Sequence, residues 1–114
     1  MLNKKDSLAL IDIESNSVRL CIYKGNMRSP DILYNKKFFC GLGQYKLGTS
    51  EITKDAEKKC INSIIFFNSI LEEIKTNHQV ALCTAAIRNA SNKKDVVSNI
   101  SKVFKGKIKI LKGD

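Results

Sequence analysis

Between two apolar stretches near the start of the chain lies a cluster of residues that could bind phosphate. Asp12 ends the first stretch, and Ser15, Asn16 and Ser17 precede the second. A tight turn between two strands leaves successive backbone N–H groups unpaired, and these three side chains add further donors. The Asp12 carboxylate could hold magnesium through water, because this cation prefers oxygen ligands and keeps several waters. An ordinary polar hairpin is the alternative, and Glu14 favours it, since a carboxylate repels phosphate and its side chain obstructs close backbone approach.

A second segment with the sequence TAAIRNASN, residues 84–92, places Arg88 among small and polar residues between an apolar run and a predicted helix. An arginine can bind a phosphate through two parallel hydrogen bonds, and the N-terminus of the following helix adds a favourable dipole. The alternative is that Arg88 forms an ordinary surface ion pair.

Other residues with suitable side chains give weaker signals. His78 is the only histidine, so a serine or cysteine nucleophile would depend on this one base, and nothing in its spacing favours such a pair. The glycines at 41, 43 and 48 do not have the G-x-G-x-x-G spacing of a dinucleotide site. We therefore expect neither a covalent catalytic pair nor a dinucleotide cofactor.

The cysteines Cys21, Cys40, Cys60 and Cys83 never approach C-x-x-C spacing, and each lies in an apolar run. This pattern indicates buried free thiols in a reducing compartment, and neither a zinc site nor a redox pair. The apolar stretch near the N-terminus is short and is interrupted by Asp12, so the sequence predicts no secretory signal and no membrane span. We expect a cytoplasmic protein.

The chain is basic, with 20 Lys+Arg against 11 Asp+Glu, a formal net charge of +9 and a pI near 9.5. Such a charge favours polyanionic partners, among them nucleic acid, nucleotides and polyphosphate. The lysines are scattered through the chain, which also fits a solvated surface. Basic and aromatic residues are not interleaved on a predicted strand face, which disfavours an RNA-binding module.

These residues need elements that position them, and the apolar pattern first predicts three strands. Residues 7–13 form a nearly continuous apolar run, residues 17–24 alternate apolar and other side chains, and residues 32–40 form a third apolar stretch. An antiparallel meander is the simplest arrangement of the three. With 114 residues the chain fits one small domain.

A long helix follows the meander. Thr53 is placed to cap its start, apolar residues recur every three or four positions from Cys60 to Ile74, and Asn77 is placed to end it.

The rest of the chain predicts a strand at 79–84, a second helix at 92–104 stopped by Gly106, and a last strand at 107–111. The order is β-β-β-α-β-α-β. It predicts an α/β fold with a mixed five-stranded sheet and helices packed on it.

Three motifs in this order resemble the beginning of the Ppx/GppA phosphatase family, which comprises exopolyphosphatases and guanosine pentaphosphate phosphohydrolases. Residues 12–20 (DIESNSVRL) resemble the family's D-I-G-S-N-S-x-R-L, residues 35–43 (NKKFFCGLG) resemble N-E-K-x-x-C-G-L-G, and residues 84–92 (TAAIRNASN) resemble T-A-A-x-R-D-A-S-N. Three motifs in the right order are far more specific than any one alone, and the resemblance covers essentially the whole chain.

The resemblance implies an actin-like ATPase, or ribonuclease H-like, lobe. It implies that residues 15–17 form the first phosphate-binding loop, that Asp12 lies near Mg²⁺, and that Arg88 contacts a phosphate of the substrate. Arg19 matches a family arginine that faces the ligand cleft. The implied reaction is hydrolysis of the terminal phosphate of polyphosphate or pppGpp, and longer family members are expected to be homodimers.

In the family, a glutamate that orients the attacking water and a second phosphate loop of D-I-G-G-G-S type follow the last strand seen here. Asp114 falls where the family has S-G-E. We therefore predict that residues 1–114 form a single partial domain, the N-terminal part of the first lobe, truncated before both features and inactive alone. No catalytic residue is assigned to the chain.

Two departures from the family pattern favour a different function. Glu14 replaces a glycine of the phosphate loop, and Asn89 replaces an aspartate beside Arg88. The alternative hypothesis is a non-catalytic remnant that binds polyanions through its positive charge. The choice between polyphosphate and guanosine phosphates also stays open.

Overall fold

The computed structural model describes residues 6–25 and 28–113, so Asp114 and its predicted place in the S-G-E motif lie outside the described residues. The elements are β1 (Ser7–Ile13), β2 (Ser17–Lys24), β3 (Asp31–Phe39), α1 (Lys54–Glu73), β4 (His78–Cys83), α2 (Ala85–Arg88), α3 (Lys93–Val103) and β5 (Lys107–Ile110). The predicted order of strands and long helices is confirmed. The short helix α2 is an addition, because its residues were expected to form a loop.

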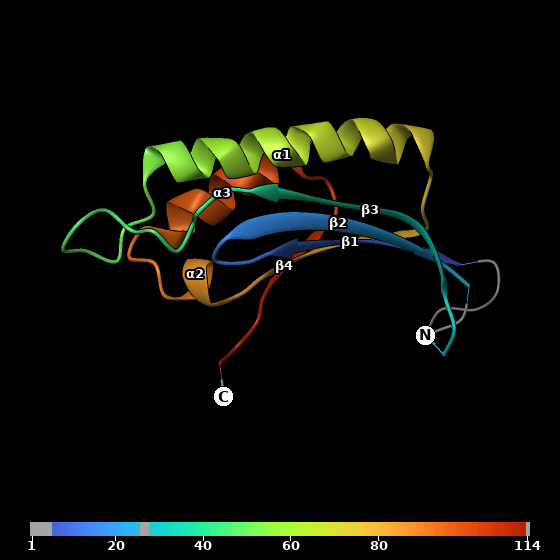
Figure 1. Cartoon of the computed structure of the whole chain (residues 1–114), viewed down its shortest axis with the longest axis horizontal. Coiled ribbons are helices and arrows are strands. Elements are labelled where there is room, and N and C mark those ends of the chain that lie inside the picture. Colours follow the sequence, from blue (N-terminus) through green and yellow to red (C-terminus); the bar gives the residue numbers. More distant parts are fainter. Residues whose placement is uncertain (1–5, 26–27, 114) are drawn as a thin grey trace.

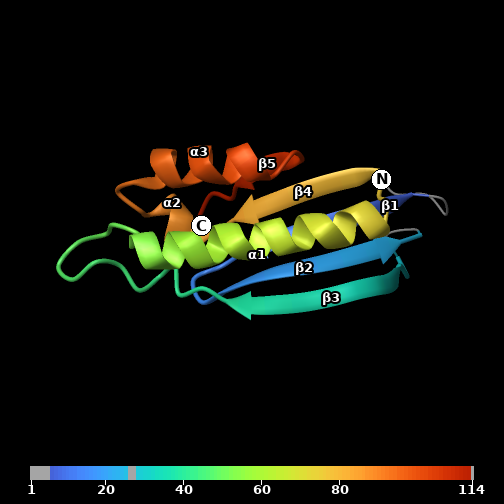
Figure 2. The same ribbon diagram turned by 90° about the horizontal axis from the view of Figure 1, so that it is seen from above.

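The strands form one five-stranded mixed sheet in the order β3-β2-β1-β4-β5. The β1–β2 and β2–β3 pairs are antiparallel, whereas β4 pairs in parallel with both β1 and β5, so the predicted meander and both crossovers are confirmed. It follows that β1, β3, β4 and β5 run in one direction. Their carboxyl ends meet at one edge of the sheet, here called the carboxyl edge, where the β1–β2 turn also lies (Figure 2).

The two long helices cover one face of the sheet. Figure 1 shows α1 and α3 on the same side of the strands. Burial along β1 alternates accordingly: Ile11 and Ile13 are fully buried, whereas Leu10 and Asp12 between and beside them are half-buried. The Asp12 side chain therefore lies on the face opposite the helices.

Helix α1 begins as its sequence predicts and ends earlier. Thr53 is its N-cap, and the Thr53 hydroxyl oxygen accepts a hydrogen bond from the Ala56 N–H at 3.1 Å. The helix ends at Glu73 rather than at Asn77, whose side-chain carbonyl accepts from the Ser7 N–H at 2.9 Å and so joins the starts of β4 and β1. Among the described residues, no helix is both long and apolar enough to cross a membrane.

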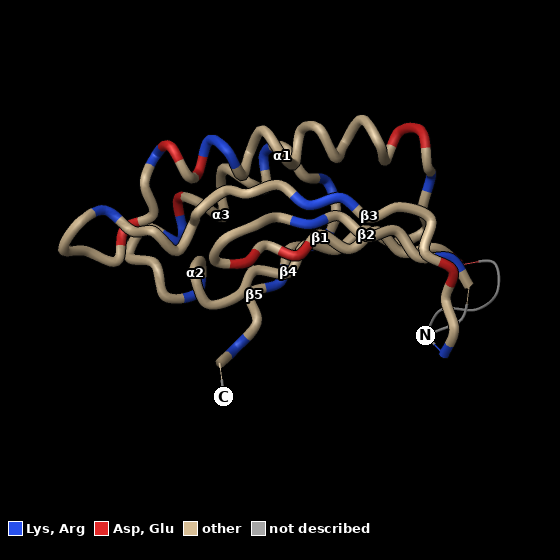
Figure 3. Tube along the Cα trace, in the orientation of Figure 1, with Lys and Arg blue, Asp and Glu red and all other residues tan. Residues whose placement is uncertain are grey.

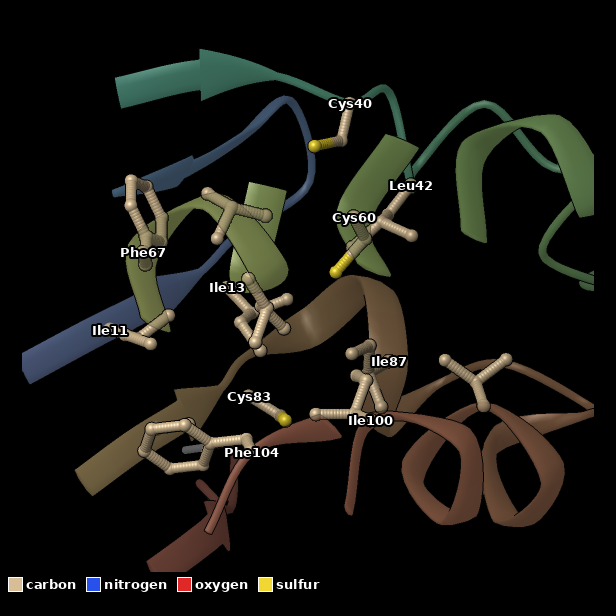
Figure 4. Close-up of a cluster of buried hydrophobic side chains, with 14 of the residues drawn as sticks. Ile11, Ile13, Cys40, Leu42, Cys60, Phe67, Cys83, Ile87, Ile100 and Phe104 are labelled. Atoms are coloured by element: carbon tan, nitrogen blue, oxygen red, sulfur yellow. The ribbon is translucent and has the colours of Figure 1, made fainter. Parts of the chain in front are cut away.

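The core lies between the sheet and the two long helices. Figure 4 shows Ile11 from β1, Phe67 from α1 and Ile100 from α3 in one buried cluster. All four cysteines are buried and free, as predicted. Burial raises the pKa of the Cys83 thiol to about 11 and raises the pKa of Cys60 as well, so both stay protonated at neutral pH.

The expected role of Gly106 as the stop signal of the second helix is wrong. Helix α3 ends at Val103 with Phe104 as its C-cap, and the φ angle of Gly106 is not positive. A Cβ atom at Gly106 would instead lie 2.5 Å from the Gln79 carbonyl oxygen and 2.6 Å from the Phe104 ring. Glycine is required because the chain passes β4 closely on its way into β5.

Candidate phosphate-binding site

The β1–β2 turn presents polar groups at the carboxyl edge. The Glu14 N–H donates to the Ser17 carbonyl at 2.9 Å, which closes the turn around Ser15 and Asn16. No non-glycine residue in the described ranges has a positive φ, so Glu14 is accommodated without left-handed backbone. Within these ranges the Ser15 and Asn16 N–H groups form no hydrogen bond to the protein, and both residues are exposed. They are available as donors to a ligand.

The loop that follows β3 holds the other side of this turn. The Cys40 and Gly41 N–H groups donate to the Asn16 carbonyl at 2.8 and 3.1 Å, and the Gly43 N–H donates to the Ser15 carbonyl at 2.8 Å. Position 41 requires glycine because its φ is +70°, a left-handed backbone conformation that other residues rarely adopt. The second motif of the sequence is thus placed against the first by backbone hydrogen bonds.

Thr84 joins the third motif to the first. Its N–H and its hydroxyl both donate to the Ile13 carbonyl, at 3.2 and 3.1 Å. Ile13 lies between Asp12 and Glu14, so the start of the Arg88 segment is fixed beside the turn. This contact follows from the parallel pairing of β1 with β4, which sequence reasoning predicted only as a crossover.

Arg88 ends the short helix α2 and contacts the segment after β5. The Arg88 guanidinium donates to the Leu111 carbonyl at 2.8 Å, and the Leu111 N–H donates to the Cys83 carbonyl at 2.9 Å. Gly113 passes so close that a Cβ atom there would lie 3.2 Å from the Arg88 guanidinium. The described residues contain no salt bridge to Arg88, so the ion pair considered as an alternative is absent from them.

Asp12 and Arg19 are direct neighbours in the β1–β2 register. Burial, and then the nearby Glu14 carboxylate, raise the pKa of Asp12, while Arg19 lowers it. The Arg19 guanidinium donates to the Asn35 side-chain carbonyl across to β3. Arg19 therefore shares a sheet face with Asp12, one residue pair along the strands from the turn.

Two further side chains support the site, and neither was predicted. The Tyr45 hydroxyl donates to the Ala86 carbonyl in α2 at 2.6 Å. The Asn92 side chain bonds both the N–H and the carbonyl of Ile52, each at 3.0 Å. Because each of these contacts joins residues about 40 apart in the chain, spacing within the sequence carries no signal for them.

Asp12 was predicted to lie near magnesium, and the donor chemistry fits. The described residues contain no group of three or more His, Cys, Asp and Glu side chains that could hold a metal ion by themselves. Magnesium usually uses one or two carboxylates, keeps several waters and binds the phosphates of the substrate. One half-buried carboxylate beside the exposed β1–β2 turn matches that mode.

Known proteins resemble this chain in sequence and in fold. A model of the Ppx/GppA phosphatase family matches residues 21–114. The chain belongs to this family. It is 28% identical over 109 residues to Exopolyphosphatase 1 of Mycobacterium leprae. The matched region covers 93% of this chain and 32% of the relative. The chain thus spans about a third of the length of the curated relatives that it matches.

Solved structures of the Ppx/GppA family have the same fold. An exopolyphosphatase from Cytophaga hutchinsonii superimposes with a TM-score of 0.84 at 27% identity, covering 93% of this chain and 34% of that one. The Ppx/GppA protein of Aquifex aeolicus also gives 0.84, at 24% identity, over 93% of this chain and 35% of its own. The predicted actin-like ATPase fold is confirmed.

Proposed function

We propose that this chain forms the N-terminal part of the first lobe of a Ppx/GppA phosphatase, where it binds the terminal phosphates of inorganic polyphosphate or of pppGpp. The observation that carries the proposal is the pair of hydrogen bonds from Thr84 to the Ile13 carbonyl. These bonds bring the 12–17 segment and the Arg88 segment to one edge of the sheet. Ligands of open α/β sheets bind at this edge.

The proposed roles follow from the donors at the carboxyl edge. The N–H groups and side chains of Ser15, Asn16 and Ser17 would donate to phosphate oxygens. Arg88 would add a charged donor pair from the neighbouring segment. Arg19 faces the same side of the sheet as Asp12 and would attract the more distant phosphates of a chain-like substrate.

Asp12 would hold Mg²⁺ through water beside the phosphates. The ion would supply positive charge where the phosphoryl oxygens gain negative charge. Asp12 itself needs to be ionised for this role, and its burial and the Glu14 carboxylate oppose ionisation. The positive charges of the bound cation and of Arg19 would offset the cost of ionising Asp12.

We propose that hydrolysis needs residues outside this chain. The chain contains no D-I-G-G-G-S sequence for a second phosphate loop, and the glutamate that the family uses to orient water is not among its residues. The 114 residues would therefore bind the phosphates of the substrate without hydrolysing it. The four buried free thiols support a cytoplasmic location, and homodimer formation is proposed for the longer family members.

Titration calorimetry of the purified chain with inorganic tripolyphosphate and MgCl₂ tests the binding proposal. Ser17→Ala and Arg88→Ala should each weaken binding by about tenfold or more, because a hydrogen bond to a charged group contributes about 1.5–3 kcal/mol. Lys102→Ala, a lysine in the last turn of α3, is the control for loss of net charge. Equal losses in all three variants would reject a specific site.

A malachite-green assay of phosphate release tests the second half of the proposal. The wild-type chain should release no phosphate from polyphosphate in the presence of Mg²⁺. Release that is abolished by Asp12→Ala would show that this chain holds a complete catalytic site, contrary to the proposal.

A further inference from the structure

The loop formed by residues 40–45, here called the 40–45 loop, is bonded to the phosphate-binding turn through its backbone. Its N–H groups hold the carbonyls of Ser15 and Asn16. In a trans peptide the next N–H points opposite to the carbonyl. Holding the Ser15 carbonyl therefore aims the Asn16 N–H away from the loop, on the exposed side of the turn. The loop thus sets the direction of one donor of the proposed site.

Gly43 brings the 40–45 loop into close contact with Ser15. A Cβ atom at Gly43 would lie 3.0 Å from the Ser15 Cβ and 3.4 Å from its hydroxyl oxygen. Gly43 does not have a positive φ, so the backbone conformation itself would accept a side chain. Glycine is needed here for space, and any side chain would displace Ser15.

The other end of the 40–45 loop holds the Arg88 segment. The Tyr45 hydroxyl donates to the carbonyl of Ala86, a buried residue two positions before Arg88 in the same short helix. Leu42, directly before Gly43 in the loop, is fully buried and fixes the loop to the core. The loop therefore connects both phosphate-binding segments to one buried anchor.

We propose that the 40–45 loop sets the position of the phosphate-binding turn relative to Arg88, with Gly43 and Tyr45 as positioning residues. This inference rests on the proposed function, because it assumes that the turn and Arg88 bind one ligand. Gly43 acts through Ser15 and Asn16, and Tyr45 acts through α2. Neither residue contacts the phosphates.

A double-mutant cycle between Gly43 and Ser15 tests the contact. Gly43→Ala should weaken tripolyphosphate binding in calorimetry by about tenfold, because small misplacement of binding groups is costly. Ser15→Gly removes the atoms that the new methyl group meets, at the expense of one hydroxyl donor. In the Ser15→Gly background, Gly43→Ala should therefore cost nothing further. Equal costs in both backgrounds would overturn the proposal.

NMR relaxation of the ¹⁵N-labelled chain tests the loop without any ligand. Gly43→Ala should lower the amide order parameters of Ser15 and Asn16, whereas Leu47→Ala, which alters a 98% exposed side chain of the same connection, should leave them unchanged. Unchanged order parameters in Gly43→Ala would overturn the proposal. If the wild-type chain binds no tripolyphosphate, the proposed function fails, and the order parameters still decide whether the loop holds the turn.

Tyr45→Phe is the second variant and covers the case in which Gly43→Ala does not fold. It removes one hydroxyl and keeps the ring. Binding of tripolyphosphate should weaken, and in the Arg88→Ala background Tyr45→Phe should cost little further affinity, because both changes act on the same contact. Fully additive losses in the Tyr45→Phe/Arg88→Ala pair would contradict a positioning role.

Discussion

At the scale of single residues, Glu14 and Asp12 are expected to affect phosphate binding in opposite ways. Glu14 would repel phosphate, whereas Asp12 would hold Mg²⁺ beside it. Glu14 is exposed at the turn and adds negative charge where phosphate would bind. Glu14 does not have a positive φ, so the turn forms without needing glycine at this position. The cost of this replacement is therefore electrostatic and steric toward the ligand rather than conformational.

Glu14→Gly should tighten tripolyphosphate binding by roughly fivefold, since removing one nearby like charge is worth about 1 kcal/mol in a solvated site. Glu14→Gln separates the two causes, because it removes the charge and keeps the side chain. Calorimetry of both variants provides the measurement. Unchanged affinity in both would mean that the turn is only structural, as the remnant hypothesis holds.

Asp12→Asn should raise the free energy of unfolding at neutral pH, as measured by urea denaturation. Burial and Glu14 raise the pKa of Asp12 in the folded chain, so its ionised form is less favourable there than in the unfolded chain. The advantage of asparagine should fall as the pH decreases and vanish below the ordinary aspartate pKa of about 4, where Asp12 is protonated in both states. A variant that is less stable at pH 7 would contradict this reading of Asp12.

The residues of the turn could be predicted because they are consecutive in the chain. Ser15, Asn16 and Ser17 interrupt two apolar runs, and that pattern alone places them at a strand end. The contacts of Thr84 and Tyr45 could not be predicted in this way, because each depends on which strands become neighbours. Strand order is a property of the whole sheet.

At the scale of elements, the apolar periodicity was sufficient for the long helices and all five strands, whose ends shift by a few residues. Helix α2 was missed because it is only four residues long, shorter than the window in which a helical repeat is recognisable. Gly106 was misread for a related reason. A glycine after a helix pattern usually marks a left-handed cap, and here close packing against β4 requires it.

Gly106→Ala should therefore destabilise the chain by about 1–3 kcal/mol, the usual cost of forcing an extra methyl group into a packed site. The methyl group would meet the Gln79 carbonyl oxygen, which belongs to β4 backbone and cannot move aside easily. Urea denaturation gives the measurement, with Lys105→Ala, an exposed neighbour, as the control. Equal stability of the two variants would contradict the close approach of this segment to β4.

At the scale of the whole molecule, the basic residues are spread out, whereas the residues proposed to bind phosphate lie together. Lysine and arginine positions are spread along the chain, over the strands β2, β3 and β5 and all three helices (Figure 3). The proposed phosphate donors, in contrast, come from separate parts of the sequence and meet at one edge of the sheet. A polyanion attracted by net charge alone would bind all over the surface, whereas one recognised by the site would bind at that edge.

Amide chemical-shift mapping of the ¹⁵N-labelled chain during titration with tripolyphosphate and Mg²⁺ tests this difference most directly. The account predicts that the largest shifts are confined to the carboxyl edge, in residues 14–17, 41–43 and 84–88, and that they saturate at one ligand per chain. Shifts that follow the lysines of α1 and α3 without saturating, or that leave the β1–β2 turn unchanged, would contradict a phosphate-binding site in this chain.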